Sequence, residues 1–299
     1  MALLATGSVD LPPFRSSVFD HGDVHAASGR IFVAHTAADG VEVVDGERLE
    51  HVRTVPGCPE ASGVLCAQDE GVVFAAARGA GRVLTIDAVS LNAVAEVASG
   101  PRPNGLAWDA RRRLLLVADV EDMTVRLLNP WTGELAGLVA LPGRPRWCVH
   151  DRERDRFLVN VREPACLAVV TAEPFALADR WPVPAAGPHG LDLDVRNGRA
   201  LVACDGGVVA ALDLATGAPA GSVEIAGEPD AIWHNAERRL LYVAIGDPGL
   251  VDVIDTATMS RRERLVTGRG AHTTAFDAAR QRLAVFLPGP CRAAIYRET

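Results

Sequence analysis

The sequence predicts an all-β fold in which seven four-stranded antiparallel units close into a ring, a seven-bladed β-propeller. Three observations lead to this prediction. One segment recurs along the chain, the recurrence has a nearly constant period, and no helical periodicity interrupts it. Several short apolar runs within a period of about 42 residues are typical of propeller blades and not of helical solenoids.

The recurring segment is clearest at Gly100–Asp119, which reads GPRPNGLAWDARRRLLLVAD. Each copy contains a Pro or Gly turn, one variable polar residue, a short apolar run, an Asx-type turn and a second apolar run. Further copies occupy 188–203, 229–244 and 271–285. Aligning the copies gives one equivalent position, at intervals of 42, 42, 42, 43, 41 and 42 residues, which is occupied by Asp20, Ser62, Asn104, Arg146, His189, Asp230 and His272.

A second register supports the same period. The runs VEVVD, VLTID, VRLLN, LAVVT, VAALD and VDVID end 42 residues apart, and a fourth alternating run follows most of them. Four β-rich runs per copy predict four strands per blade, and such blades bury their faces only by stacking radially. The predicted blades of a single domain over 1–299 are 17–56, 57–99, 100–142, 143–186, 187–226, 227–269, and 270–299 together with 1–12.

The two ends of the chain are predicted to close the ring. The last copy supplies only three strands, whereas the run ALLATGSVDLP (2–12) is similar to the outer strand ELAGLVALP (134–142). Pairing the N-terminal run with the last strand would complete the seventh blade and leave no open edge. Deletion of 1–12 is therefore expected to destabilise the whole ring.

Composition limits the partners. The chain has 299 residues, 48% of them apolar, and a net charge of −8 with acidic and basic residues interspersed. No basic face is expected, which argues against nucleic acid, and no apolar run approaches the roughly 20 residues of a membrane span. The N-terminus lacks the features of a secretory signal, so a cytoplasmic location is expected, or a periplasmic one if a leader has been removed. The six cysteines show no CxxC spacing and are expected to be buried free thiols.

The seven equivalent residues are predicted to surround one mouth of the central channel. Connections into the inner strand lie on one face of every blade, so these side chains meet there. His189, Asp230, His272 and Asp20 belong to consecutive blades and are the predicted metal ligands. Two imidazoles and two carboxylates suit Zn²⁺, Mn²⁺ or Fe²⁺ better than Ca²⁺ or Mg²⁺. The alternative is that polar residues at this position simply line a solvated channel.

A cationic arc is predicted on the other side of the mouth. It consists of Arg146 with Arg78, Arg102 and Arg162, and it suits a small anion such as a carboxylate. Arg146, Asn104 and Glu60 are the predicted ligand-binding residues of this region. The alternative is that these arginines are solvated at the tips of loops.

The pattern GxxPxGLAxD…RLLYVA…VxVID resembles the YVTN-type, or YncE-like, propeller repeat over essentially the whole chain. The resemblance implies the fold and leaves the function open, because such propellers include binding proteins and enzymes. Glu60, Asn104 and Asp230 are similar in type to the mouth residues of calcium-dependent gluconolactonase-type lactonases, which have six blades. Virginiamycin B lyases, which have seven blades and depend on magnesium, look closer in architecture, and that resemblance implies a histidine base such as His272.

Three functions remain open at this point. The first is a propeller that binds a metal ion or a small anionic ligand at the mouth. The second is a metal-dependent lyase or lactonase-like hydrolase at the same place, with His272 or His189 as the catalytic base. The third is a scaffold that binds another protein through its rim or outer surface.

Overall fold

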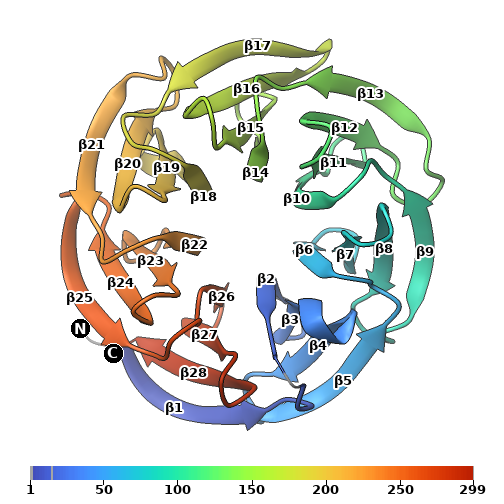
Figure 1. Cartoon of the computed structure of the whole chain (residues 1–299), viewed down its shortest axis with the longest axis vertical. Coiled ribbons are helices and arrows are strands. Elements are labelled where there is room, and N and C mark those ends of the chain that lie inside the picture. Colours follow the sequence, from blue (N-terminus) through green and yellow to red (C-terminus); the bar gives the residue numbers. More distant parts are fainter. Residues whose placement is uncertain (1–2, 15, 299) are drawn as a thin grey trace.

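The computed structural model describes residues 3–14 and 16–298, which form seven four-stranded sheets around a central channel (Figure 1). Within each sheet the strands run antiparallel from the channel outward, in chain order for the first six blades. This is the predicted seven-bladed propeller, and the fold prediction is confirmed.

The first three blades occupy the blue to green part of the ring (Figure 1). Their strands are β2 (Phe19–His25), β3 (Arg30–His35), β4 (Gly40–Asp45) and β5 (Glu50–Pro56); β6 (Ala61–Ala67), β7 (Val72–Ala77), β8 (Arg82–Asp87) and β9 (Ala93–Ala98); and β10 (Pro103–Asp109), β11 (Leu114–Asp119), β12 (Thr124–Leu128) and β13 (Leu135–Ala140).

The next three blades continue the ring. Their strands are β14 (Pro145–Asp151), β15 (Arg156–Val161), β16 (Cys166–Ala172) and β17 (Phe175–Pro182); β18 (Pro188–Asp194), β19 (Arg199–Cys204), β20 (Val208–Asp213) and β21 (Pro219–Glu224); and β22 (Pro229–Asn235), β23 (Leu240–Ile245), β24 (Leu250–Asp255) and β25 (Ser260–Val266).

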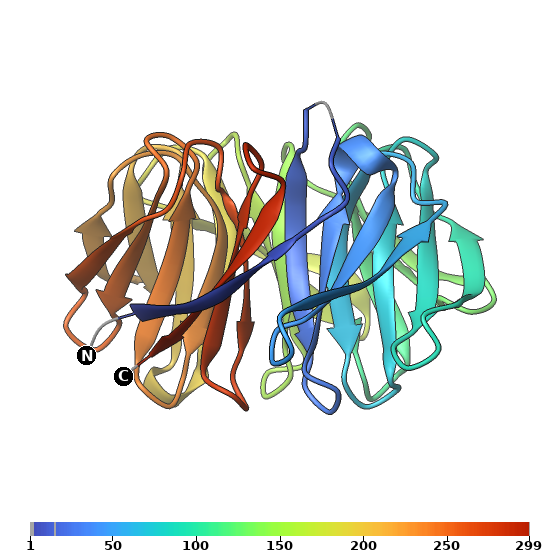
Figure 2. The ribbon, with the colours of Figure 1, turned by 90° about the horizontal axis from the view of Figure 1, so that it is seen from below.

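The seventh blade joins the two ends of the chain. It contains β26 (Thr273–Asp277), β27 (Arg282–Leu287), β28 (Arg292–Glu298) and, outermost, β1 (Leu3–Asp10). β1 pairs antiparallel with β28, and the termini lie near each other (Figure 2). Leu3 and Val9 of β1 are buried. The prediction that the N-terminal strand closes the ring is confirmed.

Burial explains why these runs form blades. The second and third strands are mostly apolar because both their faces are covered, as in β7, where every residue is apolar and buried. The outermost strands alternate, because only one face meets the ring; in β9 only Val97 is buried. All six cysteines are buried and unpaired.

The inner strands begin with an irregularity at the residue that recurs with the repeat. In six blades the pairing with the second strand shifts directly after the first residue, at the position of Asp20, Ser62, Asn104, Arg146, His189 or Asp230. Such a bulge redirects the side chain away from the regular pleat. The mouth face is uppermost in Figure 2 and carries the single-turn helix η1 (Thr36–Ala38).

The other short helix, η2 (Val195–Asn197), connects β18 to β19 on the opposite face. Within the part of the chain that the structure describes, no helix is long and apolar enough to cross a membrane.

Candidate functional site

A cavity of about 580 Å³ opens at the mouth of the channel, over blades four to seven. Its wall includes Arg146 from β14, His189 from β18, Asp230 from β22, and His272 just before β26. Arg162 and Asp205, which lie in the connections after β15 and β19, complete the charged part of the wall. The position that recurs with the repeat therefore lines one cavity in four consecutive blades.

Carboxylates and imidazoles alternate across this wall. Asp205 Oδ1 lies 2.9 Å from His189 Nδ1, and His189 Nε2 lies 3.0 Å from Asp230 Oδ1. Asp230 Oδ2 lies 2.8 Å from His272 Nδ1. We call Asp205, His189, Asp230 and His272 the ion-pair chain. Arg162 extends it, because its guanidinium lies 2.8 Å from Asp205 Oδ2.

The ion-pair chain is charged at neutral pH. Burial acts to lower the pKa of His189, but the carboxylates of Asp230 and Asp205 outweigh it and raise this pKa to about 9. Burial acts to raise the pKa of Asp230, yet the two imidazoles hold it well below its ordinary value. The pKa of His272 is raised as well, since Asp230 outweighs the effect of burial. His189 is consequently an imidazolium with a carboxylate at each ring nitrogen.

The predicted metal ligands come together only in part. His189, Asp230 and His272 are in contact, whereas Asp20 forms a neighbouring group with His21 at 2.6 Å and Arg78 at 2.9 Å. An imidazolium offers no lone pair, so a metal here would first have to displace a proton from His189. The metal assignment of these four residues stays a prediction.

A different group of residues has ligand atoms close enough for a metal ion. Asp109, His150 and Asp155 lie on the opposite face with their ligand atoms within 4.8 Å of one another. Burial lowers the pKa of His150, so its imidazole is neutral, as metal binding requires. However, Arg112 already lies 2.7 Å from a carboxylate oxygen of each aspartate. The repeat does not indicate this triad, because His150 and Asp155 belong to the blade after that of Asp109.

The predicted cationic arc contains one arginine without a partner. Arg78 pairs with Asp20, Arg102 pairs with Glu60 at 3.2 Å, and Arg162 pairs with Asp205. Arg146 makes no hydrogen bond or ion pair with the described residues, and its buried Nε lacks a hydrogen-bond partner. Burial, followed by Arg144 and Arg162, lowers the pKa of Arg146, but a guanidinium remains charged at any physiological pH.

The other two predicted ligand-binding residues lie outside the cavity wall. Glu60 is on the rim, where its side chain is 49% exposed and paired with Arg102. Asn104 is only 3% exposed, and its Oδ1 has no hydrogen-bond partner among the described residues. Of the three residues, Arg146 alone lines the cavity.

A stacked pair of rings forms a floor beneath the cavity. His21 of β2 and Trp147 of β14 lie with centroids 3.9 Å apart and planes only 6° apart. Because β2 and β14 stand on opposite sides of the channel, the stack bridges it (Figure 1). The stack lies between the mouth cavity and a second chamber toward the opposite face, because the small pocket beside it shares Asp230 with the wall of the first and Trp233 with the wall of the second.

Comparisons with known proteins define the class of the chain but not its activity. No protein-family model matches the chain, and no curated protein does. Among solved structures, a chain of Kuenenia stuttgartiensis hydrazine synthase matches with a TM-score of 0.85 over 96% of this chain and 97% of that chain, at 10% identity. At that identity the likeness shows the propeller fold alone. Membership of the YVTN-type family therefore stays a prediction.

Proposed function

We propose that this propeller binds a small organic anion, with its carboxylate or an equivalent oxyanion against Arg146 in the mouth cavity. The observation that carries the proposal is the half-buried side chain of Arg146, whose buried Nε has no hydrogen-bond partner among the described residues. A half-buried charge that no hydrogen-bonded counter-ion meets is unfavourable, so an anion from solution would stabilise the site.

The charges of the wall favour an anion over a cation. Arg162 and His189 balance Asp205 and Asp230, which leaves Arg146 as surplus positive charge, with His272 adding to it when protonated. The remaining acidic residues of the wall, Glu228 and Asp247, are exposed at the rim, and Asp247 pairs with Arg269 at 3.3 Å. The planar guanidinium suits a carboxylate because it can donate two parallel hydrogen bonds.

Isothermal titration with acetate, succinate, citrate and inorganic phosphate tests the proposal. We expect at least one of these anions to bind the native protein, and Arg146→Gln to weaken that binding at least tenfold. Arg102→Gln is the matched control, because Arg102 is also an arginine of the predicted arc but already pairs with Glu60. Equal affinity in the native protein and Arg146→Gln would contradict the proposal.

Elemental analysis of the same purified protein tests the metal alternative. Stoichiometric Zn²⁺, Mn²⁺ or Fe²⁺ that disappears in His189→Ala/His272→Ala would favour the metal assignment at the mouth. Metal that persists in His189→Ala/His272→Ala but disappears in His150→Ala would instead favour the triad of Asp109, His150 and Asp155, whose geometry permits an ion.

A second candidate function is proton-transfer chemistry on the bound anion, as in a lyase or a lactonase-like hydrolase. The ion-pair chain favours it, because a carboxylate that orients an imidazole is the usual arrangement of a general base. His272 ends the chain with its side chain 34% exposed in the cavity. This function would be supported if the protein turned over a carboxylate-bearing lactone and His272→Gln abolished turnover but kept the affinity for the anion. If no such substrate were turned over, anion binding would be the function that remains.

A further inference from the structure

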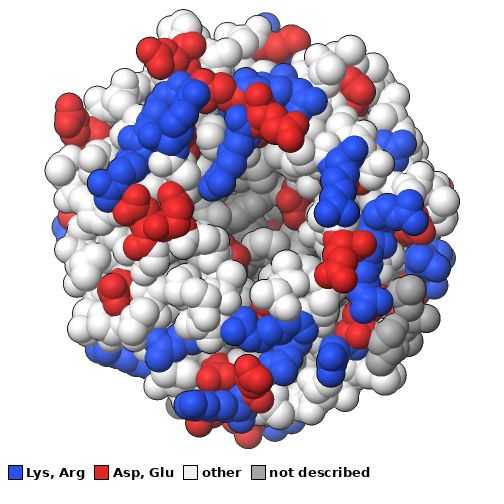
Figure 3. Space-filling view, turned by 180° about the vertical axis from the view of Figure 1, so that it is seen from behind, with Lys and Arg blue, Asp and Glu red and all other residues white. Residues whose placement is uncertain are grey.

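The channel holds a second chamber beneath the stacked rings of His21 and Trp147. It has a volume of about 240 Å³ and opens toward the face opposite the mouth, which is hollowed at its centre (Figure 3). Its wall includes the indoles of Trp108, Trp147 and Trp233 and the carboxyl groups of Asp23 and Asp192. None of these residues belongs to the wall of the mouth cavity.

The two aspartates interrupt an otherwise apolar ring around this chamber. They share one position of the repeat, three residues after Asp20 and His189, and the seven blades place there Asp23, Leu65, Ala107, Val149, Asp192, Trp233 and Ala275. Neither aspartate belongs to a turn, because β2 and β18 continue past them. Turn chemistry therefore does not explain these carboxyl groups.

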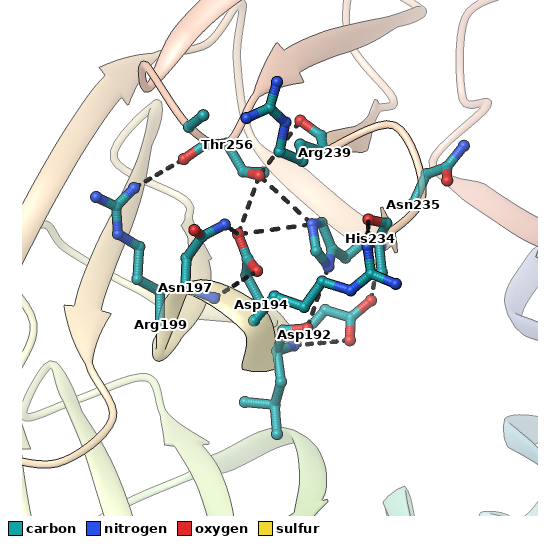
Figure 4. A network of polar contacts seen from close by, with 12 residues as sticks. Asp192, Asp194, Asn197, Arg199, His234, Asn235, Arg239 and Thr256 are labelled. Atoms are coloured by element: carbon teal, nitrogen blue, oxygen red, sulfur yellow. Dashed lines mark hydrogen bonds and ion pairs between the residues drawn. The ribbon is translucent and has the colours of Figure 1, made fainter.

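Backbone hydrogen bonds hold both carboxyl groups in place. Asp23 accepts one from Val24 N at 2.7 Å and one from Cys66 N at 2.7 Å, in the next blade. Asp192 accepts the equivalent pair from Leu193 N and His234 N, both at 2.7 Å (Figure 4). Each carboxylate oxygen can accept a second hydrogen bond, so both groups remain able to receive a ligand.

Among the described residues, the wall of the chamber holds no buried arginine to balance these groups. Burial, to which the charge of Asp192 adds, raises the pKa of Asp23 to about 7; burial also raises the pKa of Asp192. His150 in the same wall is kept neutral because burial lowers its pKa. Arg152, the one arginine of the described wall, is exposed.

We propose that this lower chamber is a binding site for a small organic cation of the alkylammonium class. The carboxylates of Asp23 and Asp192 would receive the positive charge, and the faces of the three indoles would contact the alkyl groups. Indole is the side chain that attracts an ammonium group most strongly, and desolvation increases this attraction.

The size of the chamber limits the ligand. Cavities for drug-sized molecules measure roughly 300–1,000 Å³, so a chamber of about 240 Å³ suits a smaller molecule. The His21–Trp147 stack separates this site from Arg146, and the two sites have opposite charge preferences. Each can therefore be tested without the other.

Tryptophan fluorescence titration with choline tests the proposal in the native protein. Its neutral isostere, 3,3-dimethylbutan-1-ol, has the same shape without the charge. We expect choline to change the fluorescence in a saturable manner and to bind at least tenfold more tightly than the alcohol. No saturable change with choline, or equal affinity for both compounds, would overturn the proposal, and this comparison requires no variant.

Variants then locate the site. Asp23→Asn/Asp192→Asn keeps an oxygen that can accept a backbone hydrogen bond but removes the charge, and we expect choline affinity to fall at least tenfold. Arg146→Gln, in the other cavity, is the control and should leave choline affinity unchanged. Loss of choline binding in Arg146→Gln, with retention in the double aspartate variant, would overturn the assignment to the lower chamber.

Discussion

At the scale of single residues, the mouth depends on how each charged side chain finds its partner. His189 lies between the carboxylates of Asp205 and Asp230, while Arg146 nearby has no partner among the described residues. The repeat predicted that His189, Asp230 and His272 would converge, since they share one position in adjacent blades. It could not predict that they would bind one another, because that depends on rotamers selected by the neighbouring blades.

The charged state of His189 predicts a pH-dependent contribution to stability. The pKa of His189 is about 9 in the folded protein and near 6.5 when unfolded, so its contribution is complete below about pH 6.5 and is lost as the pH rises through 9. The native protein should therefore have a higher free energy of unfolding than His189→Gln, and this difference should be larger at pH 6 than at pH 10. The change in the difference is expected to reach about 3 kcal/mol. Urea denaturation at several pH values measures this difference.

His150→Gln is the control for this measurement. Burial lowers the pKa of His150, so its imidazole is neutral in the folded and the unfolded protein between about pH 7.5 and 10. The difference in free energy of unfolding between His150→Gln and the native protein should therefore be constant over that range. If the difference in free energy of unfolding between His189→Gln and the native protein were also constant over this pH range, His189 would not be held as an imidazolium.

At the scale of the elements, the outermost strand of the last blade controls closure of the ring. β1 pairs with β28 from Leu3 opposite Glu298 to Asp10 opposite Arg292, and Arg292 Nε donates to Asp10 Oδ1 at 2.6 Å. The alternation in β1 buries Val9 and leaves Leu4 54% exposed. The sequence predicted this strand because the last copy of the repeat lacked one and the N-terminal run matched an outer strand.

Two substitutions in β1 test its role in closure. Val9→Ala removes buried methyl groups from the joint between the chain ends and should lower the free energy of unfolding by about 1–2 kcal/mol. Leu4→Ala, on the exposed face of the same strand, should change it by less than about 0.5 kcal/mol. Both values come from chemical denaturation at equilibrium. Equal effects would mean that β1 does not pack as an outer strand.

At the scale of the whole molecule, the inner strands approach so closely that some positions tolerate only glycine. A Cβ added to Gly63 of β6 would collide with the carbonyl oxygen of Asn104 in the next blade, and one added to Gly105 would collide with that of Arg146. These contacts determine the width of the channel, and so the distance across which His21 reaches Trp147. The mouth cavity and the lower chamber therefore form only when all seven blades have closed into the ring.

Gly63→Ala tests this coupling. We expect it to lower the free energy of unfolding by about 1–3 kcal/mol, because the crowded strands must move apart. Calorimetry should still show a single transition, at lower temperature, since a closed ring has no free edge from which one blade could separate. Gly289→Ala is the control, because a Cβ there would meet no atom within 4 Å. Two separate transitions for Gly63→Ala would contradict the cooperative ring.

The sequence alone determined the number of blades, the strands in each, the closure by the N-terminal run and the position of the repeat that lines the mouth cavity in four consecutive blades. These features depend on local apolar patterns and on covalent spacing, which the repeat makes visible seven times. Only the tertiary structure decided which charges pair, that Arg146 has no partner among the described residues, that the rings of His21 and Trp147 stack across the channel, and that Asp23 and Asp192 line one chamber. Those features depend on contacts across the ring, between residues that are far apart in the chain and brought together only when the blades close around the channel.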